Sequence, residues 1–162
     1  MQDSVFLDNS TFQRVWQRVI GGTDVPAAAP PETDTLADTL AECIRAKAIG
    51  AAFYTALAQR VRTGRQQLLC IAAQERAHRK ELQAEYFLRT GELCAAPAAC
   101  PHLGTAAQAL RSAHAQEIAL AERLDAAADA ASSPLRETLT AMAQQDLFHA
   151  QTVRKLLICV LR

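Results

Sequence analysis

The 162-residue chain lacks several features that mark particular classes of protein. It has no run of about 18 uncharged apolar residues, the length that a membrane-spanning helix needs. Its 17 basic and 17 acidic residues balance, so no basic excess favours binding to nucleic acid or to an anionic membrane surface. The first ten residues contain Asp3 and Asp8 and no basic segment followed by an apolar core, so we expect no secretory signal and a cytoplasmic protein.

Cysteine is present, but not in a metal-binding pattern. The five cysteines include no C-x-x-C pair, which excludes a rubredoxin-type or zinc-ribbon module. Cys94, Cys100 and His102 lie close together in an expected loop and could catch a metal or form a disulfide, but their irregular spacing and a reducing compartment favour free thiols. A chain of this length can bury a stable core without disulfides or a structural metal, so we expect any metal site to be functional and not structural.

Proline is confined to the connections between long regular segments. Because proline is costly inside a helix, its positions divide the chain. Between them, apolar residues recur every three or four positions, which predicts four long helices and, for residues 34–162, an all-α up-down four-helix bundle. The segment from Gly91 to Gly104 is the expected long crossover between two helical hairpins. The predicted helices lie at about 34–63, 65–90, 105–131 and 134–160.

Residues 1–33 form a separate N-terminal region in this interpretation. Apolar residues at helical spacing predict one short helix, which ends at Gly21-Gly22 and is followed by a linker over 25–31. We expect this helix to cap the bundle or to pack against a second copy, since a symmetric homodimer is the commonest assembly. The stripe consists of Phe12, Val15, Trp16, Val19 and Ile20.

Ionisable residues interrupt the apolar seam of every predicted bundle helix. The second and fourth helices each carry an acid followed three residues later by a histidine, which places both side chains on one helix face. The first and third helices each carry one ionisable residue near the middle. The distance in sequence from this residue to the acid of the next helix is nearly equal in the two cases, which suggests two related hairpins. The seam residues are Lys47 in the first helix, Glu75 and His78 in the second, Glu117 in the third, and Asp146 and His149 in the fourth.

Three acids and two imidazoles at matching depths in a bundle core need compensation, because an unpaired buried carboxylate costs several kcal/mol. A bound cation supplies it. One acid from each of two helices, with Glu-x-x-His from each of the other two, is the di-iron carboxylate arrangement of ferritin-like bundles. Carboxylate and imidazole ligands suit iron, in one or two ions, or manganese or zinc, and the absence of seam cysteines disfavours an iron–sulfur cluster.

Over about residues 34–160 the chain resembles ferritin-like proteins of the rubrerythrin type. The resemblance is carried by Glu75-Arg76-Ala77-His78, by Glu117 and by Asp146-Leu147-Phe148-His149. It implies a non-haem di-iron centre that reacts with peroxide or dioxygen, often within a homodimer, and that receives electrons from an unidentified donor. It also implies that Glu75, Glu117 and Asp146 are carboxylate ligands and that His78 and His149 are imidazole ligands.

The chain departs from the family pattern at several positions. Lys47 stands where the family has a glutamate ligand, and Asp146 provides a shorter arm than the usual glutamate. Peroxide-reducing members carry a further glutamate where this chain has Leu120, and they append a rubredoxin domain, whose C-x-x-C pairs do not occur in these 162 residues. These departures argue against efficient peroxidase turnover.

Lys47 leaves three interpretations open. Its ammonium could occupy the space and charge of one metal and repel a second cation, which leaves one occupied or asymmetric metal site with residual redox activity. Alternatively, the bundle is a metal-free degenerate relative in which these residues form a buried ionic network with a binding or structural role. In the third interpretation the protein is a di-iron oxidase or peroxidase in which His114 replaces the lost glutamate. A further alternative for Lys47 is that its long side chain extends past its neighbours to water.

Tyr54 lies on the same seam as Lys47 and is expected to belong to the core.

Overall fold

The computed structural model describes residues 35–96 and 102–162. The described chain forms four helices: α2 (Thr35–Arg60), α3 (Arg65–Thr90), α4 (Ala106–Asp129) and α5 (Ser133–Val160). The predicted all-α four-helix bundle is therefore confirmed, with helix ends that shift by only a few residues. The expected N-terminal helix and Cys100 lie outside the described residues, whereas Cys94 is a free thiol.

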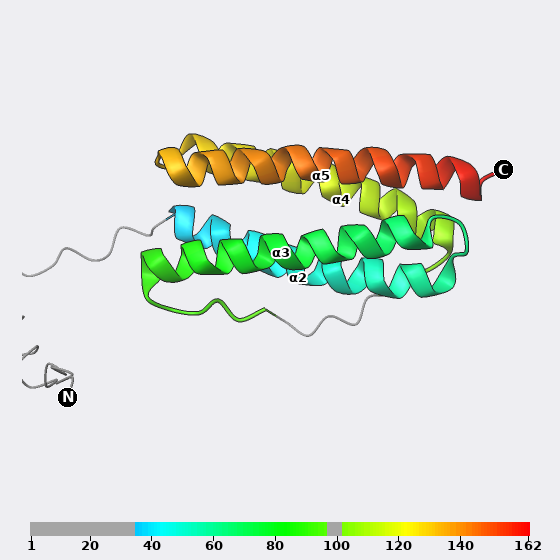
Figure 1. The fold of residues 1–162 in the computed structure, drawn as a ribbon, viewed down its shortest axis with the longest axis horizontal. Coiled ribbons are helices and arrows are strands. Elements are labelled where there is room, and N and C mark those ends of the chain that lie inside the picture. Colours follow the sequence, from blue (N-terminus) through cyan, green and yellow to red (C-terminus); the bar gives the residue numbers. More distant parts are fainter. Residues whose placement is uncertain (1–34, 97–101) are drawn as a thin grey trace, which may run out of the picture. The chain divides into compact units, whose positions relative to one another are not determined.

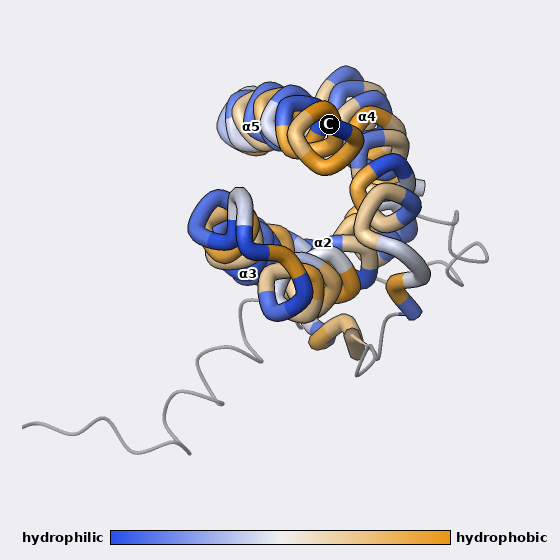
Figure 2. Tube along the Cα trace, turned by 90° about the vertical axis from the view of Figure 1, so that its right-hand side faces the viewer, coloured by the Kyte–Doolittle hydropathy of each residue, from blue (hydrophilic) through white to orange (hydrophobic). Residues whose placement is uncertain are grey.

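The four helices form two antiparallel hairpins (Figure 1). Helices α2 and α3 are joined across residues 61–64, and α4 and α5 are joined across residues 130–132. Helix α3 ends at the opposite end of the bundle from the start of α4, so the connection over 91–105 must cover the bundle's length. One long crossover between two hairpins is the connectivity of ferritin-like bundles. Figure 2 shows the four helices around a shared interior.

Local sequence signals explain where the helices begin and end. Gly64, directly before α3, has φ +79°, and a Cβ there would lie 2.2 Å from Leu156 Cδ2, so the turn between α2 and α3 requires glycine. Gly91 also has positive φ, and its N–H bonds to Phe87 O at the end of α3. Thr105 and Gln108 form a capping box at the start of α4.

The core consists of two apolar clusters separated by a buried polar layer. The first cluster contains Leu40 and Leu124, and the second contains Leu57 and Leu110. On each helix the buried polar residues lie between the stretches that contribute to the two clusters, so the polar groups share one level of the bundle. The buried polar residues are Lys47, Glu75, Glu117, Asp146 and His149.

No helix in the described parts of the chain has an apolar stretch of the length and composition that a membrane span requires.

Candidate metal centre

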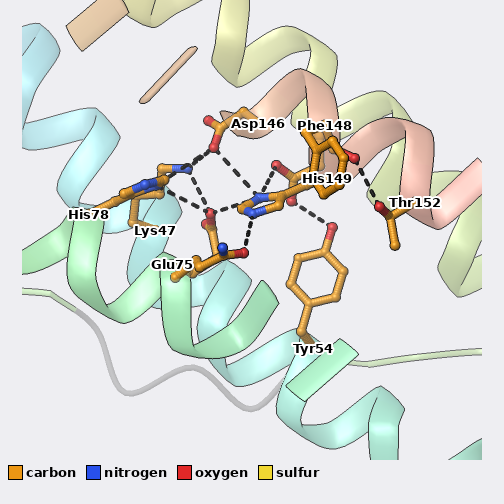
Figure 3. A network of polar contacts seen from close by, with 10 residues as sticks. Lys47, Tyr54, Glu75, His78, Asp146, Phe148, His149 and Thr152 are labelled. Atoms are coloured by element: carbon orange, nitrogen blue, oxygen red, sulfur yellow. Dashed lines mark hydrogen bonds and ion pairs between the residues drawn. The ribbon is translucent and has the colours of Figure 1, made fainter. Parts of the chain in front are cut away.

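Lys47 projects from α2 into the polar layer and is fully buried. Its Nζ donates hydrogen bonds to Glu75 Oε1 at 2.7 Å and to Asp146 Oδ1 at 2.5 Å (Figure 3). Burial disfavours the ammonium, but the carboxylates of Glu75 and Asp146 outweigh burial and raise the pKa of Lys47 above its usual value. Lys47 is therefore a charged ammonium bound between two acids, and it does not reach water.

Four side chains from three helices converge beside the ammonium. Each offers one atom of a type that binds metals, and these four atoms all lie within 4.8 Å of one another. All four residues are buried. All four are ligand candidates predicted from the sequence, and the fold brings them together. They are Glu75 from α3, Glu117 from α4, and Asp146 and His149 from α5.

His149 faces the acids with its Nδ1 atom. This atom lies 3.4 Å from Glu117 Oε2, 3.5 Å from Glu75 Oε1 and 3.7 Å from Asp146 Oδ1, distances that are long for hydrogen bonds. The opposite ring nitrogen, Nε2, lies 2.9 Å from Gln74 Oε1 and donates its hydrogen to this acceptor. Burial alone would lower the pKa of His149, but the neighbouring carboxylates outweigh burial and raise the pKa to about 9.

His78 lies at the edge of the same layer. Its Nδ1 is 3.8 Å from Asp146 Oδ1 and 3.9 Å from Glu75 Oε1, and its ring stacks on that of His149 with centroids 6.3 Å apart. Burial and the Lys47 ammonium lower the pKa of His78 to about 4, so its imidazole is neutral. His78 therefore faces Glu75 and Asp146, whose nearest oxygens already accept hydrogen bonds from Lys47. It is not one of the four converging residues described above.

Tyr54 is part of the polar layer as well as part of the core. Its hydroxyl donates to Glu117 Oε1 at 2.5 Å (Figure 3), and burial together with Glu117 raises the pKa of Tyr54 well above its usual value. The expectation that Tyr54 belongs to the core is confirmed, and the structure adds a polar contact for its hydroxyl. The bond fixes one oxygen of Glu117 and leaves the other, Oε2, facing His149.

Several buried polar atoms in this layer have no hydrogen-bond partner. Such atoms are rare in folded proteins because each costs about 1–3 kcal/mol. Two of them, Glu117 Oε2 and His149 Nδ1, lie only 3.4 Å apart. A cation bound to both would satisfy them together, and a carboxylate oxygen with an imidazole nitrogen is a donor set that Fe²⁺, Mn²⁺ and Zn²⁺ accept. The unpartnered atoms are His78 Nδ1, Glu117 Oε2, Asp146 Oδ2 and His149 Nδ1.

The ionisation of Asp146 reflects how crowded the acids are. Burial raises the pKa of Asp146 to about 7, against the opposing effect of the Lys47 ammonium. Glu75 adds to the upward shift. The layer therefore holds two cationic groups, Lys47 and His149, and one acid, Asp146, that is only partly ionised at neutral pH. A buried metal with a neutral His149 would shift this balance toward fully ionised acids.

The chain was compared with protein families, curated proteins and solved structures. No protein-family model matches the chain, and no curated protein matches its sequence. The structure is similar to that of Chlorobium tepidum ferritin, with 22% sequence identity and a TM-score of 0.44. The likeness covers 80% of this chain and 83% of that chain.

Two residues that shape the site are absent from the sequence-based candidates, and one candidate does not reach it. Gln74 orients His149, and Gly50 lies so close to Glu75 that a Cβ on it would be 2.8 Å from Oε2. Neither residue falls on a seam or in a metal-binding pattern. His114, considered as a replacement ligand, is half-buried and forms no hydrogen bond or ion pair with any residue that the structure describes.

Proposed function

We propose that the protein is a metal-binding four-helix bundle that holds a single transition metal ion, with ferrous iron as the preferred ion. Glu117 and His149 would be the principal ligands, with Glu75 and Asp146 as further carboxylates. The observation that carries this proposal is the pair of buried, unpartnered atoms, Glu117 Oε2 and His149 Nδ1, 3.4 Å apart. Each is a metal donor, and they come from different helices.

The position of Lys47 supports one ion rather than two. Its ammonium binds Glu75 Oε1 and Asp146 Oδ1, the two carboxylate oxygens that lie nearest to His78 Nδ1. A second metal between His78 and these oxygens would have to displace a charged group that has no route to water. Repulsion between two cations in a buried site is strong, so we infer that Lys47 stands in the place of the second ion.

The chain's own residues supply positioning and charge balance. Tyr54 holds one oxygen of Glu117, Gln74 fixes the ring orientation of His149, and Lys47 neutralises the acids that the metal does not use. A bound ferrous ion would supply one-electron redox chemistry toward a small oxidant, and peroxide or dioxygen are the oxidants we propose. An external electron donor and a homodimeric assembly complete the proposal.

A second candidate function is favoured by the charges already present. Lys47 makes two short ion pairs, and its ammonium could serve as the permanent cation of a metal-free bundle. Such a bundle would act by binding a partner or as a structural protein. In that case His149 keeps its proton and faces the acids as a second cation.

Metal loading separates the two functions. The protein is purified without oxygen, incubated with ferrous iron, freed of unbound metal by gel filtration and measured by elemental analysis; manganese and zinc are tested in parallel. We expect about one iron per chain, since only one cation position is left beside Lys47. Glu117→Gln should lose the metal, whereas Glu122→Gln, an exposed position on the same helix, should retain it. No bound metal after any of the three loadings would overturn the metal function in favour of the ionic network.

A further inference from the structure

A cavity of about 240 Å³ lies between α2 and α4 and leads to the candidate metal centre. Its inner end is formed by Glu75, Glu117 and Tyr54, which belong to the buried polar layer. Exposed residues such as Ile49 and Arg123 also line it, so the cavity connects the acids to the surface.

The walls of this cavity are mostly apolar, with Gln116 and Arg123 as polar lining residues on α4, and small residues keep it open. Phe53 and Leu120 contribute apolar surface, while Ala46 and Gly50 leave space on the α2 side. An apolar cavity of about 150 Å³ is large enough to bind benzene, so this one has room for a six-membered ring with a substituent. Gly50 is the residue whose missing Cβ leaves room for the Glu75 carboxylate.

The inner end accepts hydrogen bonds. Tyr54 uses its hydroxyl hydrogen on Glu117 Oε1, so Tyr54 has no hydrogen left to donate to a ligand, while Glu117 Oε1 and the Tyr54 oxygen keep lone pairs that can accept one. Glu117 itself is only 5% exposed, so it receives little compensation from water. A molecule that reaches this end is therefore favoured if it carries a donor and disfavoured if it is an anion, because it would face two carboxylates. The apolar walls disfavour a charged body of either sign.

We propose that the α2–α4 cavity binds a small uncharged molecule with an apolar body about the size of one six-membered ring and a single hydroxyl donor directed at Glu117. The proposal deepens the proposed function and rests on it for the role of the site, because the bound hydroxyl would lie beside the metal ligands. Binding itself requires only the residues of the cavity.

Three ring compounds of similar size test the chemistry. Phenol, toluene and benzoate are titrated into metal-free protein, and binding is followed by calorimetry and by saturation-transfer NMR of the ring protons. We expect phenol to bind at one site and about tenfold more tightly than toluene, since toluene has no hydrogen to donate to the acceptors at the inner end. Benzoate should bind more weakly than both. Equal affinity of phenol and benzoate, or no detectable binding of phenol, would overturn the proposal.

Replacing either of two alanine residues on α2 with leucine tests whether phenol binds in this cavity. Ala46→Leu fills the cavity and should weaken phenol binding about tenfold or more, whereas Ala48→Leu, a half-buried position outside the cavity lining, should leave it unchanged. Leu120→Trp fills the cavity from α4 and serves if Ala46→Leu does not fold. Unchanged phenol binding in a folded cavity-filling variant would contradict the location.

The two proposals fail separately. Phenol binding is measured on protein without metal, and iron content is measured on protein without phenol. Loss of metal uptake with phenol binding intact would contradict only the metal function. Metal uptake without phenol binding would contradict only the cavity proposal.

Discussion

Lys47 Nζ lies 2.5 Å from Asp146 Oδ1, although the two residues are 99 positions apart and belong to different hairpins. The same ammonium binds Glu75 within its own hairpin. Lys47 therefore ties the two halves of the bundle together at the level of the candidate metal centre. The ion pair is completely buried, so its strength is little affected by solvent.

Replacing Lys47 with methionine should destabilise the metal-free protein strongly. Methionine keeps much of the volume but leaves Glu75 and Asp146 without their cation, and breaking a buried ion pair in this way costs about 3–5 kcal/mol. The free energy of unfolding from urea titrations at neutral pH measures the effect. Lys155→Met, an exposed position on α5, is the control and should change stability little. Equal stability of the two variants would show that the ion pairs contribute nothing net.

Removing the Tyr54 hydroxyl should weaken metal binding without abolishing it. Tyr54→Phe releases Glu117 Oε1, so the carboxylate loses its fixed orientation, and loss of such an orienting bond typically costs 10- to 100-fold in metal affinity. The measurement is competition for Fe²⁺ or Zn²⁺ against a chelator of known affinity. Tyr86→Phe is the matched control, because the Tyr86 hydroxyl bonds to no residue in the described ranges. An unchanged metal affinity in Tyr54→Phe would contradict a role for the Tyr54 hydroxyl in metal binding.

Gly50→Ala should favour helix α2 but weaken metal binding. Alanine favours a helix over glycine by about 1 kcal/mol, but its Cβ would meet Glu75 Oε2 at 2.8 Å and push the carboxylate away. We expect weaker metal affinity by the same chelator competition. A more stable protein with unchanged metal affinity would mean that the Glu75 position is not critical for the metal.

The metal-free protein should lose stability as the pH rises above neutrality. The folded-state pKa of His149 is raised from 6.5 to about 9, so the folded protein holds a proton that the unfolded chain releases above pH 6.5. This contribution is fully present below pH 6.5 and is lost as the pH passes through about 9, with a slope of about 1.4 kcal/mol per pH unit in between.

Denaturant titrations of metal-free protein between pH 6.5 and 9.5 give this slope, and His149→Gln should flatten it. At lower pH the titrations of His78 and Asp146 have opposite effects on the stability of the folded protein. The lowered pKa of His78 makes stability rise with pH between about 4 and 6.5, while the raised pKa of Asp146 makes it fall between 3.8 and about 7. Stability that stays constant from pH 7 to 9 in the wild type would contradict a protonated His149.

The helices and the polar layer follow from sequence periodicity. Apolar residues every three or four positions fix which face of each helix points inward, so an ionisable residue on that face is predicted to enter the core. Glu117 could be assigned to the core in this way, whereas Lys47 could also have extended to water, and only the structure shows that it is fully buried. The prolines and the extent of the apolar repeat located the helix ends to within a few residues.

Contacts between side chains on different helices could not be predicted in the same way. The bond from Tyr54 to Glu117 depends on how far α2 and α4 are shifted along each other, and a seam pattern does not define that shift. Gln74 lies beside the seam, and its role depends on which ring nitrogen of His149 faces the acids. The closeness of Gly50 to Glu75 likewise depends on the packing of α2 against α3.

The most direct test of the account is the iron content of Lys47→Glu compared with the wild type. The variant replaces the ammonium with a fourth carboxylate, so the charge that excludes a second ion is gone and a second ligand set is complete. After anaerobic ferrous loading, elemental analysis should find about one iron per chain in the wild type and about two in Lys47→Glu, with Lys155→Glu remaining at about one. The same iron content in Lys47→Glu and in the wild type would contradict the claim that Lys47 occupies the place of a metal ion.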